Sequence, residues 1–187
     1  MDAREYRNMI QGKVNKVQGK HFEDMIENAC VEYKHAGKAY IEKNQEPFVV
    51  TRSLGRGQFS GHFRGSAQTD YTGVMAGGRT VCFEAKHTDT DRMLQSAVKD
   101  HQAEDLDHKA ELGAICFVIV GMKTEMYNVP WQTWKRMKEL FGHKYMNAED
   151  LKPYKVPAVQ GTYRFLEKIE EDANEHNDKI TDAAGDK

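Results

Sequence analysis

Two acids and a lysine mark the ends of one predicted β-hairpin, between residues 70 and 86. Asp70 opens the first strand, and Glu84 and Lys86 lie two residues apart on the second. Side chains alternate along a strand, so Glu84 and Lys86 share one face of the hairpin. Whether Asp70 joins them depends on the register of the two strands.

The length of the turn decides that register. A two-residue loop, Gly77-Gly78, would place Asp70 opposite Ala85 and away from the Glu84 face. A three-residue loop, 76–78, places Asp70 opposite Glu84, about 4.5–5.5 Å away at Cα. Two carboxylates so close repel unless a cation lies between them, and hard divalent ions bind carboxylate oxygens. We therefore predict the three-residue loop and a cation site; the alternative is a surface strand of alternating charge.

The composition is that of a single α/β domain. The 187 residues are 30% charged and 39% hydrophobic, which suits one core but not two large domains. No apolar run reaches the ~20 residues that a membrane helix needs, and the first residues contain no apolar signal sequence. We expect the chain to act in the cytoplasm, without membrane contact.

Cysteine and histidine usage argues against a zinc site. Cys30, Cys82 and Cys116 form no CxxC motif, and each falls inside a predicted element. Buried, reduced thiols are therefore the expected state. The eight histidines show no metal-binding spacing. A phosphate-cradling glycine loop is also missing from the sequence, so we expect no nucleotide cofactor.

Charge is unevenly distributed along the chain. The net charge is −2, but residues 167–187 hold eight acids and three lysines, which leaves +3 on the rest. A local basic surface decides DNA contact more than the whole-chain sum does. We divide the chain into a basic N-terminal arm at 1–18, a folded domain at 19–172 that carries the hairpin, and an acidic, disordered tail at 173–187. The arm either contacts nucleic acid or is simply solvated.

The hydrophobic periodicity predicts a mixed central sheet flanked by helices. Apolar residues spaced three and four apart predict a helix from Lys20 to Gly37, and a second helix is expected from Met93 to Leu112. Residues 114–120 are an unbroken apolar run, typical of a strand buried on both faces. The other expected elements are strands at 39–43, 47–52 and 125–129, a helix at 130–141, an extended segment at 151–157 and a helix at 163–172.

Residues 53–66 form a glycine-rich, basic segment without a single acid. Arginines bind phosphates and phenylalanine rings stack on unpaired bases, so we predict a mobile DNA-contacting loop or short stalk. Arg56 and Arg64 are the principal candidates for phosphate contact, and Lys43 and Arg52 are further ones. The alternative is an ordinary hairpin loop that places Phe63 in the core.

The chain resembles the RecU-type Holliday junction resolvases, a branch of the PD-(D/E)XK nucleases, from about Gly19 to Ile169. The order and spacing of five short pieces carry this resemblance. They are Phe22-Glu23; residues 39–44 followed by Pro47; Asp70-Tyr71-Thr72-Gly73; Phe83-Glu84-Ala85-Lys86; and His101-Gln102 ahead of the apolar strand 116–120. The chain departs from the family at Gln68, where threonine is frequent, and at 53–66, which is shorter and richer in glycine than the family's stalk.

The resemblance implies a restriction-endonuclease-like fold and a homodimeric, magnesium-dependent endonuclease, with Mn²⁺ as a substitute ion. Its substrate would be a four-way DNA junction in recombination and repair. By the same resemblance Asp70 and Glu84 would hold the metal, and Gln102 would complete its shell. The Ala85 carbonyl commonly joins such a shell. Lys86 would orient the attacking water and stabilise charge on the phosphate.

Two more residues are candidates for the same site. Gln68 is a further candidate metal ligand. Glu23, on the first helix, is a candidate accessory acid, because acids there can approach the metal in nucleases of this class. An exposed acid favoured by the helix dipole fits the position of Glu23 equally well.

Two other functions fit the same residues. A nuclease of the same superfamily could act on flaps or DNA ends in phage or bacterial replication. A non-catalytic DNA-binding module belongs to a different class, and the intact set of Asp70, Glu84 and Lys86 argues against it. Cleavage of a four-way junction, a flap and a linear duplex, compared in Mg²⁺, separates these functions.

Overall fold

A five-stranded mixed sheet forms the centre of the protein. The computed structural model describes residues 3–45, 47–63, 68–167 and 169. The strand order is β1-β4-β5-β7-β8, in which β5 and β7 are parallel and the other neighbours antiparallel. The bounds are β1 Ala39–Lys43, β4 Tyr71–Met75, β5 Thr80–Thr88, β7 Ile115–Met122 and β8 Glu125–Pro130. The predicted mixed sheet is thereby confirmed.

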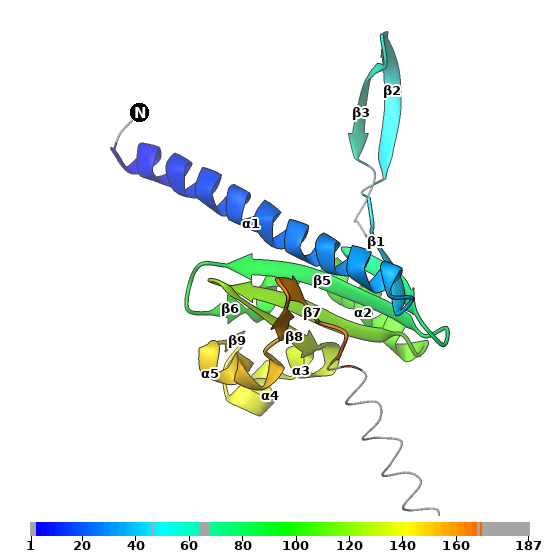
Figure 1. Cartoon of the computed structure of the whole chain (residues 1–187). Helices are drawn as coiled ribbons and strands as arrows, with labels where there is room; N and C mark the ends of the chain where they lie inside the picture. The colour runs from blue at the N-terminus through cyan, green and yellow to red at the C-terminus, as the bar shows by residue number, and fades with distance from the viewer. Residues whose placement is uncertain (1–2, 46, 64–67, 168, 170–187) are drawn as a thin grey trace, which may run out of the picture.

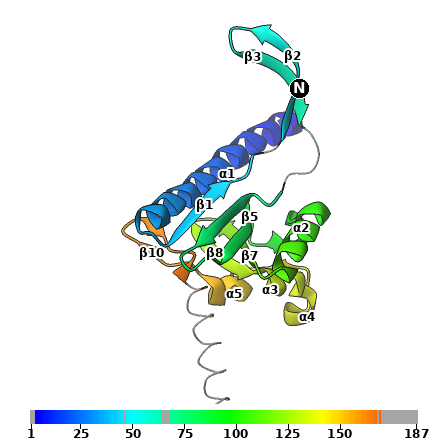
Figure 2. The same ribbon diagram turned by 90° about the vertical axis from the view of Figure 1, so that its right-hand side faces the viewer.

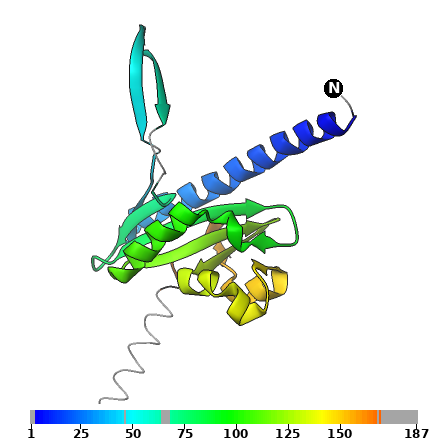
Figure 3. The ribbon, with the colours of Figure 1, turned by 180° about the vertical axis from the view of Figure 1, so that it is seen from behind.

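Helices cover both faces of this sheet (Figure 1). The long helix α1 lies across one face, and α2 packs on the other, as the view from behind shows (Figure 3). Smaller elements complete the second layer and the C-terminal part. The bounds of the helices and of these smaller strands are α1 Ala3–His35, β6 Met93–Leu94, η1 Gln95–Ala97, α2 Asp100–Glu111, α3 Trp131–Lys135, α4 Met137–Phe141, β9 Tyr145–Met146, α5 Ala148–Leu151, η2 Lys152–Tyr154, β10 Ala158–Val159 and β11 Thr162–Tyr163.

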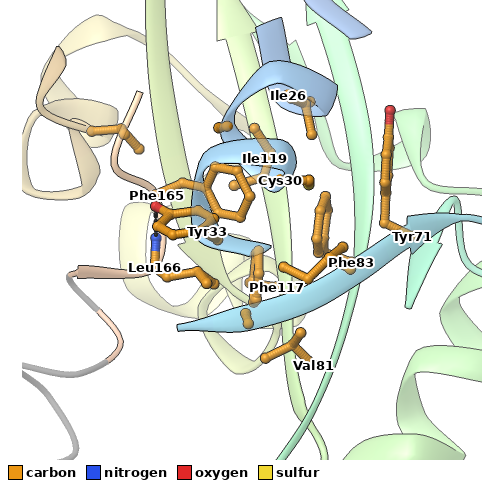
Figure 4. Close-up of a cluster of buried hydrophobic side chains, with 14 of the residues drawn as sticks. Ile26, Cys30, Tyr33, Tyr71, Val81, Phe83, Phe117, Ile119, Phe165 and Leu166 are labelled. Carbon is orange, nitrogen blue, oxygen red and sulfur yellow. Dashed lines mark hydrogen bonds between the residues drawn. The ribbon is translucent and has the colours of Figure 1, made fainter. Parts of the chain in front are cut away.

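Aromatic rings fill the core between the sheet and α1 (Figure 4). Tyr71 stacks on Phe83 with ring centroids 4.7 Å apart, and Phe83 stacks on Phe117 at 4.8 Å. Phe165 packs edge-on against Phe83, and the Leu166 N–H donates to the Tyr33 hydroxyl at 2.9 Å. These contacts fix the strands β4, β5 and β7 relative to one another and hold the C-terminal segment on α1.

A second core lies on the α2 side of the sheet, and it contains Cys82, Cys116 and the two tryptophans. Cys30 lies in the α1-side core. All three cysteines are buried and free, as the sequence predicted. Because side chains alternate along β5, Phe83 packs toward α1 while Cys82 packs toward α2.

A two-stranded hairpin projects away from the body (Figure 2). It comprises β2, Phe48–Gly55, and β3, Gln58–Phe63, and is called the stalk below. The described part of 53–66, predicted as a mobile loop or a short stalk, thus belongs to this hairpin and is not a loop. Its contact with DNA stays a prediction. Left-handed backbone at 55–57 closes the hairpin, which the glycines there permit. Phe63 is 61% exposed, so it does not enter the core.

Three predicted helices differ from the structure. The first helix begins at Ala3 and not at Lys20, so the predicted boundary between arm and domain, at 18/19, falls inside α1. The division of the chain into arm and domain stays a prediction. α2 begins at Asp100 because Met93–Leu94 pair with β9 as a short strand. The helix predicted over 130–141 is two helices, α3 and α4, that meet at Arg136.

The C-terminal predictions were also partly wrong. The segment 151–157, predicted to be extended, continues from α5 into the 3₁₀ turn η2. Tyr163, where a helix was expected to begin, belongs to the small hairpin β10–β11. The predicted tail 173–187 lies outside the described residues. Within the described ranges, no helix combines the length and apolarity needed to cross a membrane.

Candidate active site

The register of the β4–β5 hairpin brings Asp70 and Glu84 together. Tyr71 pairs with Phe83, and at the other end of β4 the Met75 N–H donates to the Arg79 carbonyl at 2.8 Å. This leaves residues 76–78 as the loop, with φ of 87° at both of its glycines. The predicted three-residue loop is confirmed, and Asp70, one residue before β4, lies beside Glu84.

Lys86 lies between the two carboxylates. Its Nζ donates to Glu84 Oε2 at 2.7 Å and to Asp70 Oδ2 at 3.3 Å. Two backbone contacts complete the cluster: the Ala85 N–H donates to Asp70 Oδ2 at 3.0 Å, and the Asp70 N–H donates to Glu84 Oε1 at 3.1 Å. Asp70, Glu84 and Lys86 therefore share one face of the sheet, as predicted.

Gln102 joins the cluster from α2 and holds Glu84. Its Nε2 donates to Glu84 Oε2 at 2.5 Å, while its Oε1 accepts the Lys99 N–H at 3.1 Å. The second contact caps the N-terminus of α2, so one side chain both starts the helix and orients the carboxylate. In this arrangement the Gln102 oxygen is used by the helix cap.

Burial shapes the electrostatics of the site. Glu84 has no exposed surface, and burial raises the pKa of its carboxyl to about 8, against the opposing effect of the Lys86 ammonium. The nearby Asp70 carboxylate raises the Glu84 pKa further. The side chain of Asp70 is 30% exposed and that of Lys86 18%. The cluster is thus closed around Glu84 and open to solvent at Asp70.

The donor atoms suit a hard divalent cation. Oxygens from two carboxylates already converge on one positive group, the Lys86 ammonium. Among the described residues no group of three or more His, Cys, Asp or Glu side chains could hold a metal. Such an ion would therefore need backbone, amide or water oxygens as well, which Mg²⁺ accepts readily. The Ala85 carbonyl and water are the neighbouring sources, because the Gln102 oxygen already accepts the Lys99 N–H and the Gln102 nitrogen faces Glu84.

Two predicted site residues lie apart from the carboxylates. Glu23 forms an ion pair with Lys43 at 2.7 Å, on the α1 side of the sheet. Gln68 is exposed and, in the described part of the chain, makes no hydrogen bond to Asp70 or Glu84. Neither side chain contacts the cluster in this arrangement.

The predicted DNA-contacting residues fall into three groups. Arg52 and Arg56 are exposed on the stalk. Lys43, at the end of β1, is paired with Glu23 and Glu27, so part of its charge is neutralised. Arg64 lies outside the described residues.

Sequence reasoning missed a set of polar residues behind Asp70. Asp105 and Lys109 on α2 bind Thr69, the residue before Asp70. Asn44, which follows β1, binds the same segment from the other side. One signal was available, because Asp105 and Lys109 follow Gln102 by three and seven residues and therefore lie on the same helix face.

A family model described as Recombination protein U, RecU, matches residues 17–171. The chain belongs to the RecU family. The matched range contains the whole carboxylate–lysine cluster, the stalk and the segment that carries Gln102. The RecU resemblance seen in the sequence is thereby confirmed.

Among curated proteins of the RecU family, the Holliday junction resolvase RecU of Bacillus pumilus is 35% identical over 95 residues, covering 48% of this chain and 45% of the relative. The Holliday junction resolvase RecU of Streptococcus sanguinis is 31% identical over 130 residues, covering 65% and 64%. The matches thus span between about half and two thirds of the length of these RecU proteins.

A solved structure, that of Archaeoglobus fulgidus Hjc, a Holliday junction resolvase from an archaeal hyperthermophile, is also similar. It is 14% identical, with a TM-score of 0.43, over 72% of this chain and 93% of that chain.

Proposed function

We propose that the chain is a metal-dependent endonuclease that hydrolyses phosphodiester bonds in branched DNA, with the four-way junction as its substrate. The observation that carries the proposal is Lys86 held between the Asp70 and Glu84 carboxylates at 3.3 and 2.7 Å. Membership of the RecU family, whose curated relatives are named Holliday junction resolvases, supports the choice of substrate.

Each side chain of the cluster has a role in this proposal. Asp70 and Glu84 would hold Mg²⁺, for which Mn²⁺ would substitute, together with the Ala85 carbonyl and, through water, Gln102. The bound ion would lower the pKa of a coordinated water and withdraw charge from the phosphoryl oxygen. Lys86 orients the attacking water and stabilises the charge that develops on the phosphate, since its ammonium is already fixed by the carboxylates.

The stalk supplies the DNA contacts. Arg52 and Arg56 are exposed on it, and Phe59 is 56% exposed near its tip. Cationic side chains bind phosphates and exposed rings stack on unpaired bases, which a junction offers at its centre. Lys43 lies where the stalk leaves the sheet and would contact phosphate only by giving up its pairing with Glu23.

The proposal includes a restriction-endonuclease-like fold and a homodimer. The mixed sheet with helices on both faces supports the fold assignment. A four-way junction has two equivalent strands to cut, and two active sites related by a two-fold axis match that symmetry. Light scattering of the purified chain measures the oligomeric state.

A cleavage assay tests the proposed function. A four-way junction, a flap and a linear duplex are incubated with the protein in Mg²⁺ and in Mn²⁺, with Asp70→Asn as the control. Preferred cutting of the junction, lost in Asp70→Asn, is the expected result. Preferred cutting of the flap or of duplex ends would replace the substrate, and binding without cutting in either ion would replace the nuclease by a DNA-binding module.

A further inference from the structure

The residue before Asp70 is enclosed by hydrogen bonds. Thr69 has no exposed surface, and its N–H donates to Asp105 Oδ2 at 2.9 Å. Its carbonyl accepts from Asn44 Nδ2 at 2.6 Å, and its Oγ1 accepts from Lys109 Nζ at 2.9 Å. Lys109 also donates to Asp105 at 2.7 Å, so the Asp105 carboxylate neutralises the Lys109 charge.

Asn44 ties the same segment to the sheet. Its backbone N–H donates to the Asp70 carbonyl at 2.8 Å, and its Nδ2 also donates to Thr72 Oγ1 at 2.9 Å. Asn44 lies where the chain leaves β1 for the stalk, and Thr69 lies where it returns. The two crossings between body and stalk are therefore bonded to each other beside Asp70.

This network fixes a carboxylate that it does not touch. Asp70 makes three contacts within the cluster: its N–H donates to Glu84, and its Oδ2 accepts from the Ala85 N–H and from Lys86. A shift of the preceding peptide would alter all three contacts. Thr69 is buried, so without the Asp105 acceptor its N–H would either stay without a hydrogen bond or move, together with its segment, to find another acceptor.

We infer that Asp105 and Asn44 are positioning residues for the metal ligand Asp70, acting through Thr69. The inference rests on the proposed function, since it concerns the metal-binding geometry of that site. Partners that orient metal ligands without touching the metal typically change metal affinity by about 10–100-fold when removed. We expect a loss of that size for Asp105→Ala and Asn44→Ala.

The test measures Mn²⁺ binding to the DNA-free protein by calorimetry, so it does not depend on cleavage. Asp107→Ala is a matched control, because Asp107 lies on the same helix as Asp105. Asp107 likewise accepts from a lysine and from an N–H: Lys135 and the Trp131 indole each donate to it at 2.7 Å. Asp105→Asn keeps an oxygen for the Thr69 N–H and should restore part of the affinity. Junction binding in EDTA should stay within twofold of wild type in all variants.

The expected result is a dissociation constant for Mn²⁺ raised tenfold or more in Asp105→Ala and Asn44→Ala, and unchanged in Asp107→Ala. Wild-type affinity in both positioning variants, or an equal loss in Asp107→Ala, would overturn the inference. If Asp105→Ala does not fold, Asn44→Ala and Asp105→Asn decide. A wild-type protein that binds Mn²⁺ but cuts no DNA refutes the nuclease alone, whereas one that binds no Mn²⁺ refutes both.

Discussion

Replacement of Lys86 by alanine separates the chemistry of the site from its DNA binding. The Lys86 ammonium lies 2.7 Å from Glu84 Oε2 and 3.3 Å from Asp70 Oδ2, and its side chain is only 18% exposed. It is therefore fixed before substrate arrives, and no reorganisation is needed when charge develops on the phosphate.

The size of the effect follows from Coulomb's law. About half a unit of additional negative charge, ~3 Å from the ammonium at an effective dielectric constant of ~20, is worth roughly 3 kcal/mol. That corresponds to about a 10²-fold loss of rate, which agrees with the roughly 10²–10³-fold effects of removing one preorganised donor. Junction affinity should change little, because Lys86 is one cation beside two acids.

The assay is single-turnover cleavage of an end-labelled four-way junction with the protein in excess, together with junction binding in EDTA. Lys135→Ala is the control, since Lys135 is also ion-paired at 2.7 Å but lies on α3, paired with Asp107. We expect a rate at least 10²-fold lower for Lys86→Ala and an unchanged rate for Lys135→Ala. A Lys86→Ala variant that cuts within threefold of wild type would refute the reasoning.

Three further predictions concern metal binding, DNA binding and packing. Because the pKa of Glu84 is raised from 4.5 to about 8, its proton competes with the ion, and the rise in Tm caused by Mg²⁺ should be larger at pH 8.5 than at pH 6.5. The folded state binds the extra proton between these two pKa values, so metal-free protein should lose stability as the pH rises from about 4.5 to about 8. Equal Mg²⁺ shifts at both pH values would contradict this. Arg52→Ala combined with Arg56→Ala should weaken junction binding and reduce the slope of log affinity against log salt by about 2, measured by fluorescence anisotropy; an unchanged slope would exclude these phosphate contacts. Gly73→Ala should destabilise the fold by about 2 kcal/mol or more, because the added Cβ would lie 2.4 Å from the Tyr40 carbonyl oxygen. Gly19→Ala, in open space on α1, should instead stabilise the fold by about 0.5–1 kcal/mol. Urea unfolding measures both changes, and equal effects would count against the packing at Gly73.

Local features of the sequence were enough to predict the hairpin and its register. Side-chain alternation placed Glu84 and Lys86 on one face, and the expected pairing of Asp70 with Glu84 around a cation selected the three-residue loop 76–78 over the two-residue loop Gly77-Gly78. These are short-range properties of the chain. The apolar run at residues 114–120 likewise predicted a central strand, observed at Ile115–Met122, since a strand buried on both faces is apolar throughout.

Features that depend on distant parts of the chain were predicted less well. Met93–Leu94 continue an apolar stripe, yet they form a strand because β9 pairs with them from far along the chain. The hairpin of β2 and β3 is a different case, because its strands are neighbours in the chain: the glycines of 53–66 suggested a loop or short stalk, whereas the β-branched and aromatic residues pair across a tight turn. Hydrophobic periodicity depends on neighbours along the chain and does not identify a pairing strand that lies far away in the sequence, such as β9.

The sequence by itself determined the chemical groups of the site and the strand face on which three of them lie. Only the tertiary structure decided how α2 meets that face. The packing of this helix directs the Gln102 nitrogen at Glu84 and brings Asp105 to the backbone of Thr69. The physical reason is that turn and strand geometry act between neighbours along the chain, whereas the position of a helix on a sheet depends on the fit of the whole core between them.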